Sequence, residues 1–321
     1  MGVARALLGT CRRSPLAGCV AAALLLVALL PDVAHAWTPG THVALGDAVL
    51  SSLHLIPKGI ADLLRAFPYD FLYGSIAADS SIAKKYAPVG RHCHSWVVGL
   101  EIYDRARDDD PLRAFGLGYL AHLSADVVAH NYFVPRQLAI TSSTAALGHS
   151  YWETRFETHL SERFSRSARE LLSRDHSRSD AHLDRILSPT IFSTHTNRRI
   201  FRGMVVAADS ESWQRVFHLL VENSRWDLDD LSVSRYLERS FDFIVDLLNR
   251  FDESEPYSLD PAGDEQLRFA KRVRRSAIQR GGGTHVARQA ARHFGLPRTS
   301  LTYAASLEQP LYTALARSDN N

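Results

Sequence analysis

The sequence has little cysteine: three residues in 321, namely Cys11, Cys19 and Cys93. The first two fall in residues 1–36, where three arginines precede the apolar run CVAAALLLVALL and the small-residue end AHA, a pattern typical of a secretory signal. Cleavage after Ala36 would leave Cys93 as the sole thiol, so no internal disulfide could form in the exported chain. A disulfide-stabilised secreted domain is thereby excluded, and the fold must depend on a packed core.

A long hydrophobic run is also missing. The apolar run in residues 1–36 is shorter than the about 20 residues that a membrane-spanning helix requires. We therefore expect cleavage, with Trp37 as the first residue of the working protein, and a retained membrane anchor is the alternative. The residues that follow suffice for one large or two modest domains.

A strong excess of charge of either sign is absent as well. The whole sequence has 37 basic and 35 acidic side chains, and removal of residues 1–36 leaves 34 of each. Nucleic-acid-binding proteins usually carry a basic excess or a basic patch. The cluster RVRR at 272–275 is local, and we interpret it as a solvated helix face. We therefore expect no nucleic-acid partner.

Alternation with period two, which indicates half-buried strands, is scarce. Apolar residues recur instead at steps of three and four in segments such as 41–54, 110–130 and 231–251. This periodicity predicts an all-α fold in the form of a multi-helix bundle.

The segment DESEPYSLDPAGDE, residues 252–265, is polar and contains two prolines, so we interpret it as a linker. The predicted organisation is a signal peptide at 1–36, a main helical domain at 37–252, and a linker with a helical C-terminal extension at 253–321. The glycine-rich segment RGGGTH at 280–285 is expected to break this extension again.

The segment AHLSADVVAHN and the later HSYWE place histidines and carboxylates at metal-binding spacings. His122, Asp126 and His130 are four residues apart, so on one helix they share a face, about 6 Å from each other. His149 and Glu153 repeat the four-residue step and would supply a second helix. Neutral imidazole and carboxylate are ligands that zinc accepts, and a carboxylate between two imidazoles can bridge two ions. The spacing therefore predicts a metal cluster.

Cleavage after Ala36 would create a further candidate ligand. The free amine and the carbonyl oxygen of Trp37 can chelate an ion, whereas its indole is not a ligand, and His42 follows in WTPGTH. The alternative role of Trp37 is that of a hydrophobic plug.

These residues resemble the pattern of the zinc-dependent phospholipase C family, which includes α-toxin and small bacterial phospholipases and whose mature chains begin with tryptophan. The resemblance spans about residues 37 to 160. It follows, in the family's order, GTH ending at His42, YGSIAAD ending at Asp79, HSW beginning at His94, AHLSAD with His122 and Asp126, and GHSYWE with His149 and Glu153. It implies the helical bundle of the zinc-dependent phospholipase C and single-strand nuclease type.

Three other residues compete with members of this set. His92 in GRHCHSW competes with His94, and the family's His-x-Trp order favours His94, which stands two residues before the tryptophan. Asp70 competes with Asp79 but lacks a glycine five residues earlier. Cys93 could supply a thiolate, for which the family pattern has no counterpart.

The step from Asp126 to His130 departs from the secreted toxins. The toxins place six residues between the corresponding aspartate and histidine, whereas the step here is four. The shorter step resembles the catalytic domain of glycosylphosphatidylinositol-specific phospholipase D. This departure weakens the carry-over of substrate preference from the toxins, and the lipid head group stays open. The choice between C-type and D-type cleavage also stays open, because it depends on how the lipid lies across the metal ions and no residue identified in the sequence fixes that.

The family's arrangement implies up to three zinc ions. One would be held by Asp79, His94, His122 and Asp126, a second by His130, His149 and Glu153, and a third by Trp37, His42 and Asp126. Six positive charges against three carboxylates would leave a net positive site, which suits a phosphodiester anion. Asp79, which keeps a second oxygen, is the expected acceptor of a proton from the attacking water.

Together these patterns favour an exported zinc-dependent phosphodiester hydrolase that acts as a phospholipase C on phospholipids, with catalysis in residues 37–252. The alternatives are a phospholipase D-type lipid hydrolase, a single-strand nuclease of the same fold, and a non-catalytic zinc-containing lipid-binding protein. The protein would be secreted or periplasmic and could contact a membrane peripherally. Its oligomeric state is not indicated by the sequence.

Residues fused ahead of Trp37 are expected to remove one of the three zinc sites, because an amide nitrogen is a poor donor for a metal ion. The test compares the zinc content per chain of a protein that begins at Trp37 with that of an extended form. Full zinc content in the extended form would contradict a chelate at the N-terminus.

Overall fold

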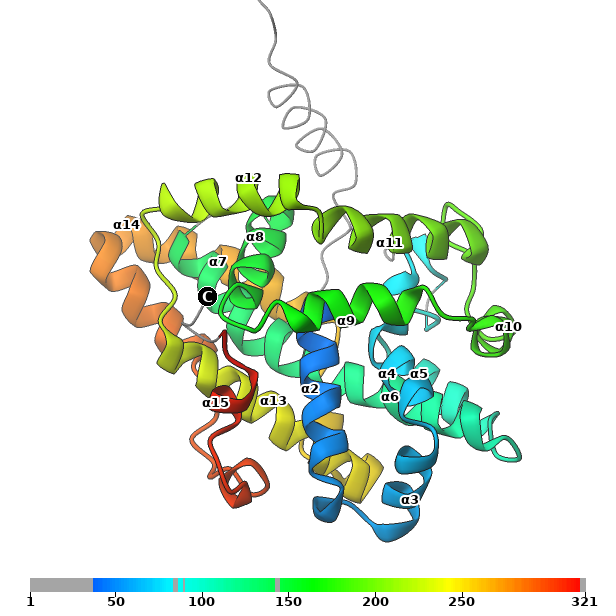
Figure 1. The fold of residues 1–321 in the computed structure, drawn as a ribbon. Coiled ribbons are helices and arrows are strands. Elements are labelled where there is room, and N and C mark those ends of the chain that lie inside the picture. Colours follow the sequence, from blue (N-terminus) through cyan, green and yellow to red (C-terminus); the bar gives the residue numbers. More distant parts are fainter. Residues whose placement is uncertain (1–36, 83–85, 89, 142–144, 318–321) are drawn as a thin grey trace, which may run out of the picture.

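The computed structural model describes residues 37–82, 86–88, 90–141 and 145–317, so the predicted signal segment, residues 1–36, lies outside the described residues. Helices and no strands form in the described part of the chain (Figure 1), which confirms the predicted all-α class. Within the same residues, no helix is long and apolar enough to span a bilayer.

The helices are α2 (Pro39–Ser51), α3 (Lys58–Ala66), α4 (Pro68–Ala77), α5 (Trp96–Asp104), α6 (Asp110–Val128), α7 (Val134–Thr141), α8 (Ala145–Glu157), α9 (Arg163–Leu172), α10 (Ser177–Asp184), α11 (Thr194–Ala208), α12 (Glu211–Glu222), α13 (Asp230–Arg250), α14 (Asp264–Phe294) and α15 (Leu311–Leu315). Short 3₁₀ turns cover Leu53–Leu55, Ala78–Ser80, Phe251–Glu253, Pro256–Ser258 and Ala304–Ser306. A π-helical turn, Ala129–Phe133, separates α6 from α7.

Helix α6 forms the centre of the molecule. Every residue from Ala114 to Val128 is buried, and α4, α5 and α13 pack around it. A helix enclosed on all sides needs no polar face, which explains why α6 carries almost no charged residue beyond its first turn. Its start is fixed by the Asp109 side chain, which accepts a hydrogen bond from the Leu112 amide. The charged and imidazole side chains that α6 does bury are therefore exceptional.

Two glycines bring α4 and α6 into backbone contact. A Cβ atom added at Gly74 would lie 2.0 Å from the Phe115 carbonyl oxygen, and one at Gly118 would lie 2.0 Å from the Phe71 carbonyl oxygen. Gly74 is the glycine that stands five residues before Asp79 in the sequence element YGSIAAD. The close crossing sets the end of α4, and so Asp79, against α6.

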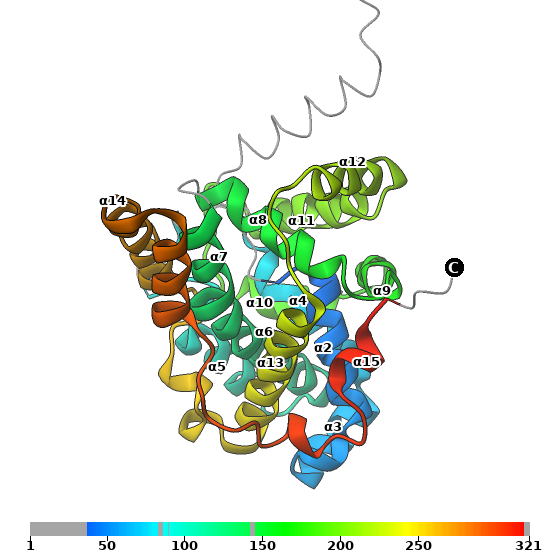
Figure 2. The same ribbon diagram turned by 90° about the vertical axis from the view of Figure 1, so that its left-hand side faces the viewer.

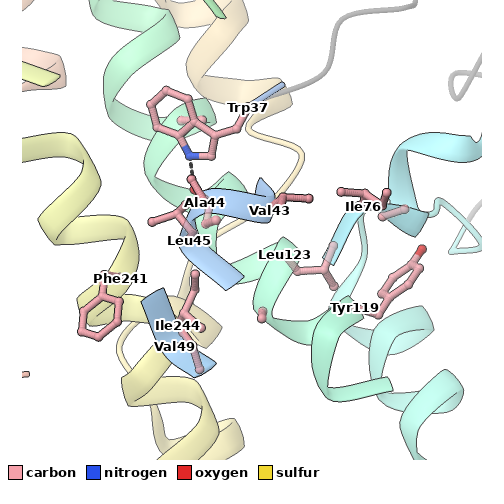
Figure 3. Packing of buried hydrophobic residues seen from close by; sticks show 14 of the residues in the cluster. Trp37, Val43, Ala44, Leu45, Val49, Ile76, Tyr119, Leu123, Phe241 and Ile244 are labelled. Atoms are coloured by element: carbon pink, nitrogen blue, oxygen red, sulfur yellow. Dashed lines mark hydrogen bonds between the residues drawn. The ribbon is translucent and has the colours of Figure 1, made fainter. Parts of the chain in front are cut away.

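The hydrophobic core continues from Trp37 to the C-terminal segment. Figure 3 shows side chains of α2 lying between α13, represented by Phe241 and Ile244, and α6, represented by Leu123. Leu315 of α15 belongs to the same buried cluster. Residues on both sides of the predicted boundary at 252 thus share one core, and the division into a domain and an extension stays a prediction.

Helix α14 lies at the edge of the molecule beside α7 (Figure 2). The break expected within residues 280–285 is confirmed at Gly282, whose φ of 70° interrupts the helix. The two arms of α14, residues 264–281 and 283–294, are therefore joined at a glycine that tolerates the left-handed region.

Substitution Gly118→Ala is expected to lower the free energy of unfolding by about 3 kcal/mol or more, because the new methyl group meets backbone that cannot move aside. Gly203→Ala is the matched control: it also lies in a helix, has open space around its Cβ position, and should raise stability by about 0.5–1 kcal/mol. Urea unfolding of both variants measures the difference. A Gly118→Ala protein as stable as the unchanged one would contradict the close crossing.

Candidate metal centre

Three buried histidines from separate elements converge on the Asp126 carboxylate of α6, and Asp79 lies beside them. One carboxylate oxygen lies 2.9 Å from His94 Nε2 and 3.2 Å from His122 Nε2, and the other lies 3.2 Å from His42 Nε2. Asp79, in the 3₁₀ turn after α4, places an oxygen 3.3 Å from His94 Nε2. All five side chains are almost completely shielded from solvent. The two oxygens of Asp126 face different histidines, as a bridging carboxylate would.

A second group forms where α8 faces the π-helical turn. His149 Nε2 lies 2.7 Å from a carboxylate oxygen of Glu153, one helical turn further along α8. The His130 ring lies 5.3 Å from the His149 ring and 6.3 Å from the His94 ring. The second group is therefore adjacent to the first, and His130 stands between them.

The structure thus brings together the eight predicted ligand side chains that follow Trp37. Potential ligand atoms lie within 4.8 Å of one another in three buried triads: His42, Asp79 and His122; His94, His122 and Asp126; and His130, His149 and Glu153. The last triad is the predicted second site. The first differs from the predicted grouping because His42 also approaches Asp79. Ligation itself, and the number of ions, stay predictions.

Two backbone carbonyls orient the histidines of this cluster. His122 Nδ1 donates to the Ser75 carbonyl at 2.8 Å, and His130 Nδ1 donates to the Pro261 carbonyl at 2.6 Å. Because a carbonyl can only accept, each ring carries its proton on Nδ1 and keeps the Nε2 lone pair for the cluster. Such partners fix the tautomer and ring angle of metal-binding histidines.

The π-helical turn and the segment 260–263 were not foreseen from the sequence. The Asn131 side-chain amide donates to the carbonyls of Val127 and Asp260, which ties the turn to that segment. Gly263, with a φ of 60°, packs so closely that a Cβ atom there would lie 2.4 Å from the His130 Cβ. The polar, proline-containing segment 252–265 signalled a linker, and nothing in its pattern signalled contact with a histidine more than a hundred residues earlier.

The competing residues lie in different surroundings. His92 is half-buried and its Nδ1 accepts a hydrogen bond from the His94 amide at 3.0 Å, while Cys93 Sγ lies 3.2 Å from His94 Nδ1. These three could form a further triad with one another. Asp70 belongs to none of the triads found among the described residues. Its carboxyl pKa is raised by partial burial, against an opposing influence of His176.

Trp37 is bonded to α6 at Ala125, the residue before Asp126. Its indole nitrogen, labelled with Trp37 in Figure 3, donates to the Ala125 carbonyl at 3.0 Å. Its ring packs with its centroid 4.2 Å from that of Phe156 and 5.2 Å from that of Phe133. The indole therefore has the packing role that the sequence offered as the alternative. Chelation by the Trp37 amine is a separate property and stays a prediction.

Burial sets the charge state of the cluster. Burial, together with nearby His122, lowers the pKa of His42 to about 4, and burial with His149 and His94 nearby lowers the pKa of His130 to about 3. Burial alone would raise the pKa of Asp126, but His122, His42 and His94 outweigh it and hold that pKa well below its usual range. The neutral imidazoles of His42 and His130 and the ionised carboxylate of Asp126 are the forms that bind metal ions.

The residues present fit a divalent cation. Both Asp126 oxygens and His42 Nε2 are buried and make no hydrogen bond of normal geometry, although they lie close to one another. An ionised carboxylate left in this state is strongly unfavourable inside a protein. Imidazole nitrogens and carboxylate oxygens at these separations form a ligand set that suits zinc.

Comparison with known proteins identifies a related family. Residues 41–199 match the family model described as zinc dependent phospholipase C. The matched segment includes every predicted ligand except Trp37. No curated protein and no solved structure shows a significant match to the chain.

Acid is expected to destabilise the metal-free protein between pH 6.5 and about 4. His42 and His130 have pKa values in the folded protein below the 6.5 of the unfolded chain. Their contribution to the free energy of unfolding is therefore complete above pH 6.5 and is lost as the pH falls towards their folded pKa values. The slope should approach about 1.4 kcal/mol per pH unit for each histidine. Urea unfolding of chelator-treated protein at several pH values measures it. A His42→Asn variant should show a shallower slope, and an equal slope would contradict the assignment to His42.

Proposed function

This chain belongs to the zinc-dependent phospholipase C family, and we propose that it hydrolyses phospholipids as a phospholipase C. The observation that supports this activity best is the convergence of buried imidazoles on the Asp126 carboxylate, beside a second triad of ligand type. Zinc ions held by these groups would supply positive charge that polarises water and the oxygens of a phosphodiester.

The side chains have distinct tasks in this proposal. Asp126 connects His94 with His122, since one of its carboxylate oxygens lies near the Nε2 atoms of both histidines. Asp79, fully buried, holds one oxygen towards His94 and is the proposed acceptor of the proton from the attacking water. Apolar residues of α6, such as Leu123 and Val127, exclude bulk water and strengthen these electrostatic interactions.

Cleavage on the glycerol side of phosphorus is the proposed C-type reaction. With phosphatidylcholine as substrate it releases phosphocholine and diacylglycerol, whereas D-type cleavage releases choline and phosphatidate. Family membership supports the C type. Product analysis on one defined lipid distinguishes the two reactions, and release of nucleotides from single-stranded DNA would identify the nuclease alternative.

We also infer that the working protein is exported and begins at Trp37. The basic, apolar and small-residue zones of residues 1–36 support this inference, as does the small-residue end AHA directly before Trp37. N-terminal sequencing of the protein recovered outside the producing cytoplasm tests it. A chain that retains residues 1–36 would contradict it.

His122→Ala and Asp126→Asn are each expected to reduce phosphatidylcholine hydrolysis at least about a hundredfold, because loss of a ligand should exceed the effect of losing an outer partner. Both should also lower the zinc content per chain. His218→Ala, an exposed histidine on α12, is the control and should change neither property. Variants that keep full zinc content and full hydrolysis would contradict the proposed centre.

A further inference from the structure

Helix α14 has an unusual charge distribution. Residues 266–294 contain eight arginine and lysine side chains and no aspartate or glutamate. Residues 37–321 contain 34 residues of each sign, so this basic segment is balanced by an acidic excess elsewhere. The net charge of the whole chain therefore does not reveal the strong positive charge of this one helix.

The two arms of α14 fold against each other. The Phe269 ring of the first arm lies 5.1 Å from His293 and 5.6 Å from Phe294 of the second arm, so the arms run antiparallel from the break at Gly282. Ala270, Val273, Ala290 and Phe294 form a small buried cluster with Ala139 of α7. The apolar sides of both arms are thus covered.

The basic side chains of the first arm occupy the opposite side. Arg268 stands three and four residues before Lys271 and Arg272, and Arg275 stands four and three residues after them, which places all four on one helical face. The buried residues Ala270, Val273 and Ala277 lie on the opposite face, and all four basic residues are exposed. Ile278, next to this basic face, is 51% exposed. We call these four residues the basic face.

These cations have few acidic partners. Arg268 lies 3.9 Å from Asp264, and Arg274 is engaged because it donates to the carbonyls of Ala139 and Ile140 at the end of α7. The remaining six of the eight basic side chains have no carboxylate within 4.0 Å among the described residues: Lys271, Arg272, Arg275, Arg280, Arg288 and Arg292. Their charge is available to an external anion.

Helix α14, which carries the basic face, begins beside the candidate metal centre. Asp264, the first residue of α14, lines an open pocket of about 400 Å³ together with His94, Trp96 and Pro261. His94 belongs to the ligand cluster, and the Pro261 carbonyl orients His130. A surface held against the start of α14 would therefore lie close to this pocket, which His94 of the ligand cluster lines.

We propose that the basic face of α14 docks the enzyme on an anionic phospholipid surface. The inference rests on the proposed function in one respect, namely that the substrate is a lipid. The apolar side of α14 stays packed on the protein, so the attraction comes from its exposed basic side chains, which suit an anionic lipid surface. Nucleic acid fits less well, because the phenylalanines of α14 are buried or half-buried and offer no exposed ring for base stacking.

The test measures binding to vesicles of phosphatidylglycerol and phosphatidylcholine, compared with vesicles of phosphatidylcholine alone. The triple variant Lys271→Glu, Arg272→Glu and Arg275→Glu should weaken binding to the anionic vesicles at least about a hundredfold, since each basic residue near such a surface strengthens binding about fivefold. Binding of the unchanged protein should also fall steeply as salt is added.

A matched control changes total charge by the same amount elsewhere. Arg166→Glu, Arg185→Glu and Arg199→Glu alter three exposed arginines outside α14, and this protein should keep its vesicle binding within a few-fold. Equal weakening in both triple variants would show a net-charge effect and overturn the proposal. Retained vesicle binding in the α14 variant would also overturn the proposal. The same holds if the α14 substitutions weaken binding to single-stranded DNA but leave binding to vesicles unchanged. The Lys271→Gln, Arg272→Gln and Arg275→Gln variant repeats the test if the glutamate protein fails to fold.

Hydrolysis of a monomeric short-chain phosphatidylcholine separates this inference from the proposed function. Both triple variants should hydrolyse the monomer at the rate of the unchanged protein, because the basic face lies outside the ligand cluster. A loss of monomer hydrolysis confined to the α14 variant would overturn docking as the sole role of the basic face. If the unchanged protein binds anionic vesicles through α14 but hydrolyses no monomer, docking is supported and the proposed hydrolysis is contradicted.

Discussion

The organising constraint in this molecule is the burial of an ionised carboxylate, Asp126, inside a helix that is otherwise apolar. A lone negative charge at that depth would be strongly unfavourable, so its neighbours must compensate for it. His42, His94 and His122 approach it from three elements and hold its pKa low. The burial of His42 in turn favours the neutral form of that imidazole. The same arrangement that satisfies the carboxylate presents neutral nitrogens and charged oxygens to a cation. Stability of the centre and its capacity for metal thus have one physical origin.

Much of the candidate site could be predicted because helical spacing is local. The four-residue steps in AHLSADVVAH and HSYWE determine which side chains share a helix face, whatever the surrounding fold. The resemblance to the zinc-dependent phospholipase C family then linked these helices to Asp79 and His94, which spacing alone could not do. The structure adds a physical reason for the glycine in YGSIAAD, since Gly74 permits the helix crossing that sets Asp79 in place.

The rest could not be predicted because it depends on contacts between distant segments. The π-helical turn at Ala129–Phe133 is held by Asn131, whose side chain bonds both the preceding turn and the carbonyl of Asp260. A polar segment with two prolines has the composition of a linker, and its packing against His130 leaves no mark in that composition. For the same reason RVRR was interpreted as an ordinary solvated face. Arg272 and Arg275 are exposed as expected, but contacts between distant segments place Arg274 against α7 and the start of α14 at a pocket that His94 lines.

The contact between His130 and the Pro261 carbonyl links the metal centre to the timing of biosynthesis. A ribosome makes the chain from the N-terminus, so the remaining candidate ligand side chains exist before the residue that orients His130 has been joined to the chain. A nascent polypeptide that ends at α13 therefore lacks the carbonyl that orients His130 in the triad with His149 and Glu153. An ion bound by that triad would meet His130 in its final orientation only after the C-terminal segment has been made.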